Sequence, residues 1–102
     1  MAELEIPKGT IKILSDITGE PRLDVAIRMT LKDMIEHRLE KINKEIKGLE
    51  KKYRTNFSEF EKNWKSWKIK NKFSYNVEKD YLEWDSLSTR KKKLEQASKW
   101  LN

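Results

Sequence analysis

The chain has 102 residues, which is the length of one small domain. It contains 23 Lys and Arg against 17 Asp and Glu, which gives a net charge of +6. It contains no cysteine and one histidine, which excludes disulfides, thiol nucleophiles and zinc sites built from several such ligands. Charged residues make up 39% and hydrophobic residues 36% of the chain, so we expect a thin hydrophobic seam rather than a deep core.

The first twenty residues predict a short arm followed by a short helix. Polar and apolar residues alternate over residues 3–6, before Pro7, as they do in an edge strand. Apolar residues then recur at spacing three over residues 11–17, and Gly19 is expected to end this helix.

A long helix is predicted over residues 21–54. Pro21 suits its first turn, and from Leu23 to Tyr53 apolar residues step by three or four, which is a heptad seam. Gly48 costs about 1 kcal/mol inside a helix, so a bend there is an alternative to one continuous helix. At 1.5 Å per residue such a helix is roughly 50 Å long, which predicts an elongated molecule.

Two further helices are predicted to pack back along the long one. The first spans residues 56–70 and starts either at Asn56, with Glu59 three residues on, or two residues later at Ser58. Its aromatic residues would share one face: Phe57, Phe60, Trp64 and Trp67.

The last helix is predicted over residues 76–101. Apolar residues recur there at threes, fours and sevens: Val77, Tyr81, Trp84, Leu87, Leu94 and Leu101. The sequence therefore predicts an all-α, elongated single domain over residues 1–102, with a short N-terminal arm, one long central helix and a two-helix C-terminal part.

No catalytic, phosphate-binding or metal-binding motif is present, which favours a non-enzymatic protein without a cofactor. The acids of residues 78–85 are typical of charges at a helix start, and His37 is expected at the surface. The chain lacks a long uncharged stretch, and its acidic start is unlike a signal peptide, so we expect a cytoplasmic protein with no membrane partner.

The apolar seam and the tryptophans predict binding to a second protein, because a slender helical protein has little depth in which to bury them. The expected partner-binding residues are Ile35, Leu39, Ile42, Ile46, Leu49, Tyr53, Trp64, Trp67, Tyr81 and Trp84. Pairing of the long helix with a second copy, in a homodimer or a larger coiled coil, is an alternative.

A second interpretation is direct contact with nucleic acid. Lysines that alternate with aromatic residues could neutralise phosphates while the rings stack on bases. The residues that would do this are Lys62, Lys65, Lys68, Lys70, Lys72, Arg90, Lys91, Lys92 and Lys93. Residues 41–75 concentrate the positive charge, with 11 basic residues and 4 acidic ones.

The N-terminal segments resemble the ribbon-helix-helix motif of prokaryotic antitoxins and repressors. The resemblance covers residues 2 to about 40 and rests on Leu4-Glu5-Ile6-Pro7, the short helix, Thr18-Gly19-Glu20-Pro21-Arg22, and Asp24-Val25-Ala26-Ile27-Arg28 with Leu31. It implies that Glu3 and Glu5 would be the residues that face DNA, and their acidity opposes contact with phosphate. It also implies that the helical remainder would bind and neutralise a cognate toxin.

Overall fold

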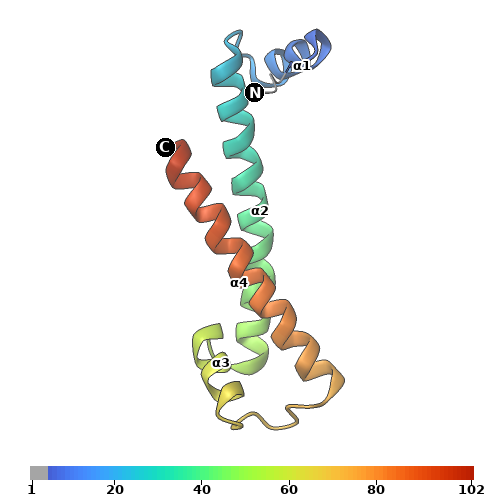
Figure 1. Ribbon diagram of the computed structural model, residues 1–102, viewed down its shortest axis with the longest axis vertical. Helices are drawn as coiled ribbons and strands as arrows, with labels where there is room; N and C mark the ends of the chain where they lie inside the picture. Colours follow the sequence, from blue (N-terminus) through green and yellow to red (C-terminus); the bar gives the residue numbers. More distant parts are fainter. Residues whose placement is uncertain (1–4) are drawn as a thin grey trace.

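The computed structural model describes residues 5–102, and within them the chain forms helices and no strand (Figure 1). The helices are α1 (Lys8–Thr18), α2 (Leu23–Tyr53), α3 (Phe57–Lys65) and α4 (Tyr75–Leu101). Helix α4 returns antiparallel along α2, α1 packs near the start of α2, and α3 lies near its end. The predicted all-α, elongated fold with a long central helix is confirmed.

The molecule is extended and has an unusually large surface. It measures 56 × 32 × 24 Å and has a radius of gyration of 19.4 Å, against about 13 Å for a compact domain of this length. Its accessible surface is 8543 Å², against about 6,100 Å² for a compact monomer of this size. The excess is larger than the area of about 800 Å² that one partner contributes to a standard protein interface.

The N-terminal arm and α1 fit their predictions in part. Of the strand expected over residues 3–6, residues 3 and 4 lie outside the described residues, and residues 5 and 6 have no regular secondary structure. Helix α1 ends at Gly19 as expected, with φ at 71° and the Gly19 N–H donating to the Ser15 carbonyl oxygen at 2.8 Å. Glycine suits this position because it enters the left-handed region without steric cost.

The predicted start of the long helix was wrong by two residues. Helix α2 begins at Leu23, and Arg22 stands before it in an extended conformation. The Glu20 carboxylate accepts hydrogen bonds from the backbone N–H and from Nε of Arg22, both at 3.1 Å, and these bonds lower the pKa of Glu20. This local turn places Pro21 outside the helix rather than in its first turn.

Helix α2 is continuous through Gly48, so the bend that was an alternative there does not occur. The seam residues Ile35 and Ile42 are buried, and Leu39, Ile46 and Leu49 are half-buried, on the side along which α4 packs. From Ile35 onward the seam therefore packs within one chain, whereas Leu31, an earlier seam residue, stays exposed.

Replacement of Gly48 by alanine is expected to stabilise the protein. Apart from the adjacent residues and the nearby backbone of α2 itself, a Cβ atom built at Gly48 meets no atom within 4 Å, so the methyl group fits without strain. Alanine favours a helix interior over glycine by about 1 kcal/mol, which corresponds to a rise in Tm of about 4–8 °C for a domain of this size. Thermal unfolding of Gly48→Ala followed by circular dichroism measures this, and an unchanged or lower Tm would contradict a continuous, unstrained helix at residue 48.

Helix α3 starts at the first of the two predicted positions. Asn56 Oδ1 accepts a hydrogen bond from the Glu59 N–H at 2.9 Å, which is an N-cap. Its predicted end at residue 70 was wrong, because the helix stops at Lys65.

A left-handed turn ends α3. The Lys68 N–H donates to the Asn63 carbonyl at 2.9 Å and the Trp67 N–H donates to the Trp64 carbonyl at 3.2 Å, with Trp67 at φ 62°. These two bonds form a Schellman motif, which usually has glycine where Trp67 stands. Trp67 is thereby removed from the helical face that it was predicted to share.

Helix α4 begins at Tyr75, one residue before its predicted start, where Ser74 Oγ accepts a hydrogen bond from the Val77 N–H at 3.4 Å. Its seam matches the prediction. Trp84 and Leu101 are buried, and the others are half-buried: Val77, Tyr81, Leu87 and Leu94.

An aromatic core joins α2, α3 and α4. Trp84 is fully buried, and its ring centroid lies 5.1 Å from that of Phe60 and 5.9 Å from that of Tyr53. Trp64 stacks on Tyr81 with centroids 4.4 Å apart. Aromatic pairs at these distances are favourable beyond the area that they bury, so this end of the molecule is its best-packed part.

Asp80 ties the start of α4 to the end of α2. One of its carboxylate oxygens accepts hydrogen bonds from Lys52 Nζ and from the Tyr53 hydroxyl, both at 2.5 Å. Burial alone would raise the pKa of Asp80, but these hydrogen bonds outweigh it and hold the pKa below its ordinary value. Burial and the Asp80 carboxylate raise the pKa of Tyr53, so its hydroxyl keeps the proton that it donates.

Asp80→Asn is expected to lower the free energy of unfolding by about 1 kcal/mol at pH 7, because it removes a charge-assisted hydrogen bond. The folded state lowers the Asp80 pKa, so the stabilisation is present above the pKa of the unfolded chain and disappears as the pH falls through the folded pKa. Urea unfolding should show the gap between wild type and variant closing below about pH 4. A gap of equal size at pH 7 and pH 3 would contradict this role.

Candidate partner-binding surfaces

Most of the predicted partner-binding residues are packed inside the chain. Trp67 is the exposed member of that set, with 68% of its surface accessible. The remainder are buried or half-buried: Ile35, Leu39, Ile42, Ile46, Leu49, Tyr53, Trp64, Tyr81 and Trp84. Two surfaces of the described residues are accessible to a partner: the loop between α3 and α4, which carries Trp67, and one flank of the α2–α4 pair.

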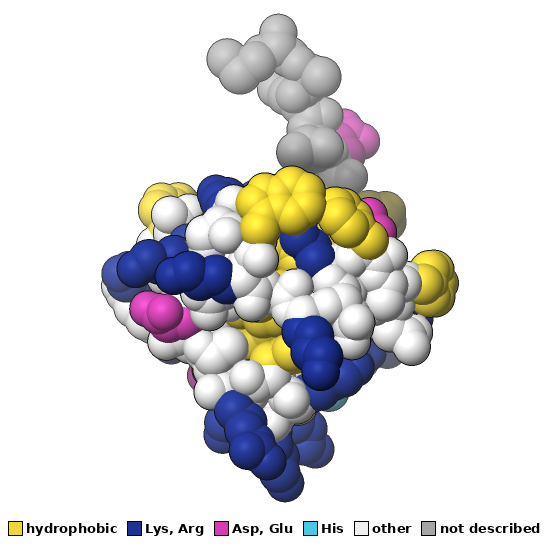
Figure 2. Space-filling model, turned by 90° about the horizontal axis from the view of Figure 1, so that it is seen from below, with side chains coloured by type: hydrophobic (Ala, Val, Ile, Leu, Met, Phe, Trp, Pro, Cys, Tyr) yellow, Lys and Arg dark blue, Asp and Glu magenta, His cyan; other side chains and the backbone are white. Residues whose placement is uncertain are grey.

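The first surface is the aromatic cap, which we define as Trp67, Lys72 and Phe73. The rings of Trp67 and Phe73 lie 5.3 Å apart between centroids and are tilted by 59° to each other. Phe73 is 71% exposed. In the view along the long axis, hydrophobic side chains form a ridge on this end of the molecule with lysine and arginine side chains near it (Figure 2).

Lys72 joins the two rings of the cap to each other and to the end of α3. Its Nζ lies 3.8 Å from the centroid of the Trp67 ring and 5.8 Å from that of Phe73, and it donates a hydrogen bond to the Trp64 carbonyl at 2.8 Å. Cation–π contacts of this kind contribute about 0.5–2 kcal/mol each. The ammonium group is thus engaged by the chain's own rings and by the end of α3.

Trp67 adopts a backbone conformation that is costly for a bulky residue. A side chain with a Cβ atom in the left-handed region costs about 1–2 kcal/mol relative to the right-handed region. The ring gains little burial in return, since most of its surface stays accessible. Arg54 ends α2 in the same left-handed conformation, so at both residues this conformation serves to end a helix.

The predicted nucleic-acid residues divide into two separate groups. Lys62, Lys65, Lys68, Lys70 and Lys72 lie on α3 and the loop after it, whereas Arg90, Lys91, Lys92 and Lys93 lie along α4. Arg90 follows the start of α4 by fifteen residues, or about 22 Å of helix. Within the first group, Lys65 pairs with Glu61 at 3.8 Å and Lys72 is held by the cap.

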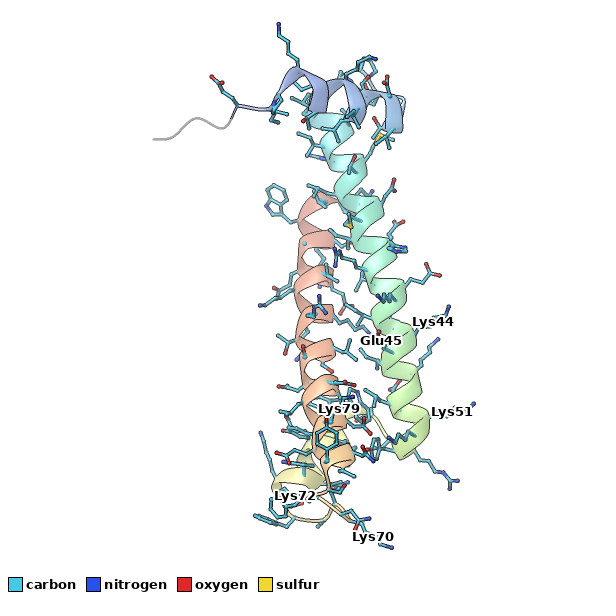
Figure 3. The ribbon with its side chains drawn as sticks, turned by 90° about the vertical axis from the view of Figure 1, so that its right-hand side faces the viewer. Lys44, Glu45, Lys51, Lys70, Lys72 and Lys79 are labelled. Atoms are coloured by element: carbon cyan, nitrogen blue, oxygen red, sulfur yellow. The ribbon has the colours of Figure 1, made fainter. Side chains whose placement is uncertain are left out.

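The second surface contains a hollow of about 330 Å³ between α2 and α4. Its floor is Ile42 and Leu94, and four cations surround it: Arg38, Lys41, Arg90 and Lys93. Glu45 also borders it, on the side of α2 that faces α4, while Lys44 lies on the far side (Figure 3). The sequence suggested phosphate binding for the run at residues 90–93, but not that Arg38 and Lys41 of α2 would meet it.

Two classes of site are not found in the part of the chain that the structure covers. Among residues 5–102, no group of three or more His, Cys, Asp or Glu side chains is placed to hold a metal ion. Across the same residues, no helix combines the length and hydrophobicity needed to span a membrane.

Comparison with known proteins places this fold in a family. The family model described as "Uncharacterized protein MJ0235 family" matches residues 12–102, which include all of α2, α3 and α4. The chain belongs to this family. No curated protein and no solved structure matches the chain. The match to the MJ0235 family covers both the aromatic cap and the hollow, so both surfaces belong to the segment that defines the family.

Proposed function

We propose that this MJ0235-family protein is a non-enzymatic binding protein that holds a second protein on its aromatic cap. The observation that carries the proposal is the exposure of Trp67 and Phe73 on a loop that the chain fixes through Lys72. Tryptophan and other aromatic side chains dominate the energy of protein interfaces, and a preformed cap loses little conformational entropy on binding.

The chemistry around the cap favours a partner with an apolar recess and an acidic rim. Lys68 and Lys70 are exposed on the same loop as the two rings, and residues 41–75 as a whole are strongly basic. Complementary charges around an apolar anchor speed association and select the partner. Tyr75 and Leu82 are also exposed, but they line a separate hollow on α4 with Glu78 and are not part of the cap.

The more specific role is the antitoxin of a toxin–antitoxin module. Its support is the order of a short helix, the left-handed Gly19 and a long helix, together with the exposed cap. Co-expression with the product of the adjacent gene tests it. We expect a complex that survives purification and relief of any toxicity, and a product that neither binds nor is neutralised would remove the antitoxin role.

Nucleic acid is a second candidate, favoured by the exposure of Lys62, Lys68 and Lys70 on α3 and on the loop that also carries the exposed rings, which could stack on bases. Its test is the salt dependence of binding to single-stranded RNA and DNA. Contact with three phosphates predicts a slope of about −2 in a plot of log affinity against log salt for single strands. A slope near zero would exclude this candidate.

A further inference from the structure

The flank of the α2–α4 pair that contains the hollow is built in heptad layers. The four cations around the hollow form what we call the basic layer: Arg38, Lys41, Arg90 and Lys93. A residue seven positions away on a packed helix lies on nearly the same side, two turns further along. Because α2 and α4 are antiparallel, the next layer along the flank is found by subtracting seven from the residue numbers on one helix and adding seven on the other.

One layer toward the C-terminus of α4, all four positions are apolar. The shift replaces the two α2 cations by Leu31 and Met34, and the two α4 cations by Ala97 and Trp100. The larger three are exposed at 45%, 48% and 84% respectively. We call these four residues the apolar layer. Trp100 is the most exposed large hydrophobic side chain of the described residues, and a monomer gives it no cover.

One layer in the opposite direction, the charge reverses. The corresponding positions are Glu45 and Gly48 on α2 and Glu83 and Ser86 on α4, and we call these the acidic layer. They line a second hollow of about 580 Å³, which shares Glu45 and Arg90 with the first. The two hollows therefore form one groove whose character changes along its length.

The basic layer lacks internal neutralisation. The ion pairs that form among the described residues involve none of its four side chains. With Glu45 included, the side chains around the hollow carry four positive charges and one negative charge, and the repulsion among the cations is relieved further when carboxylates enter the hollow. The floor of Ile42 and Leu94 suits a ligand that brings an apolar stripe along with its acids.

We propose that this flank binds an acidic amphipathic helix of a partner protein, as the third helix of a bundle with α2 and α4. Three heptads of such a helix, about 32 Å, span the apolar, basic and acidic layers. The partner helix would place apolar side chains on Trp100 and Met34, carboxylates in the basic layer, and a lysine or arginine near Glu45 and Glu83. Helix-in-groove binding of this kind uses anchors at spacings of three, four and seven.

The order of the layers distinguishes a helix from a polyanion. A nucleic-acid strand that follows the groove would meet Glu45 and Glu83 in the second hollow, and these repel phosphate, while Lys52 there is already paired with Asp80. A partner helix can reverse its charge every heptad and can also cover the apolar layer. The inference rests on the proposed role as a binding protein, but it uses a different surface from the aromatic cap.

The test is to select, from a library of 21-residue helical peptides with randomised faces, those peptides that bind the full-length chain. We expect peptides with apolar residues in one heptad, Asp or Glu in the next and Lys or Arg in the third. Binding of a selected peptide should weaken at least tenfold in Trp100→Ala and in the double variant Arg38→Glu, Arg90→Glu, and a peptide with its acids replaced by lysine should not bind.

Matched controls separate this site from the cap. Trp67→Ala with Phe73→Ala should leave peptide binding unchanged, and circular dichroism should show native helicity in every variant. The inference is overturned by selected peptides without the acidic heptad, by equal binding to wild type and Trp100→Ala, or by failure of the selection. It is also overturned if sedimentation shows that a second copy occupies the flank, with Trp100→Ala dissociating a dimer.

Discussion

Trp84→Ala is expected to lower the free energy of unfolding by about 3–5 kcal/mol, the largest loss from any single substitution in this chain. Trp84 is fully buried, and its ring contacts the rings of Tyr53, Phe57 and Phe60, which come from the end of α2 and from α3. Its removal leaves a cavity where three helices meet. A domain of this size has only about 5–15 kcal/mol of stability, so urea unfolding should show a large drop in the midpoint.

Trp84→Phe is the matched control. No described residue accepts a hydrogen bond from the buried Trp84 Nε1, so the indole N–H is a cost to the fold that phenylalanine removes. Phenylalanine also keeps an aromatic ring near Phe60. We expect Trp84→Phe to retain most of the stability, and equal losses for the two variants would contradict an aromatic core centred on residue 84.

Joint replacement of Trp67 and Phe73 by alanine is expected to weaken binding of the partner protein by a factor of 30 or more. Interface hot spots cost about 2 kcal/mol or more when truncated, and each factor of ten corresponds to about 1.4 kcal/mol. Titration calorimetry of the purified complex measures the change. The fold should survive, because both side chains are more than two-thirds exposed.

Tyr75→Ala with Leu82→Ala is the comparison for the cap variant, since these side chains are also exposed but belong to the outer face of α4. We expect this pair of substitutions to weaken binding of the partner protein less than the Trp67, Phe73 variant does. Equal affinities for wild type and the Trp67, Phe73 variant would show that the partner is held elsewhere.

The helical periodicities predicted the fold because they report directly which side of a helix is buried. The heptad seam from Ile35 to Tyr53 and the α4 seam both face inward as expected. Helix ends were less predictable, because they depend on local hydrogen bonds. The Ser66 hydroxyl donates to the Lys62 carbonyl at 3.0 Å, and the Schellman turn ends α3 five residues before its predicted end.

The docking surfaces were harder to predict than the fold. A hydrophobic seam on one helix looks the same in sequence whether a partner chain or the same chain covers it, and here α4 covers the seam of α2. The hollow depends on the register between α2 and α4, which brings Arg38 and Arg90, 52 positions apart in the sequence, to the same hollow. The signal that sequence did contain was the number of tryptophans, since Trp67 and Trp100 stay exposed after folding.

We expect the apolar surface left exposed on this chain to be covered by another molecule in the cell. Hydroxyl-radical footprinting of the four tryptophans, in the purified monomer and inside living cells, measures this coverage. Trp67 and Trp100 should be labelled strongly in the monomer, and one or both should be protected in the cell, with Trp84 protected throughout. Equal labelling of Trp67 and Trp100 in the two settings would contradict it.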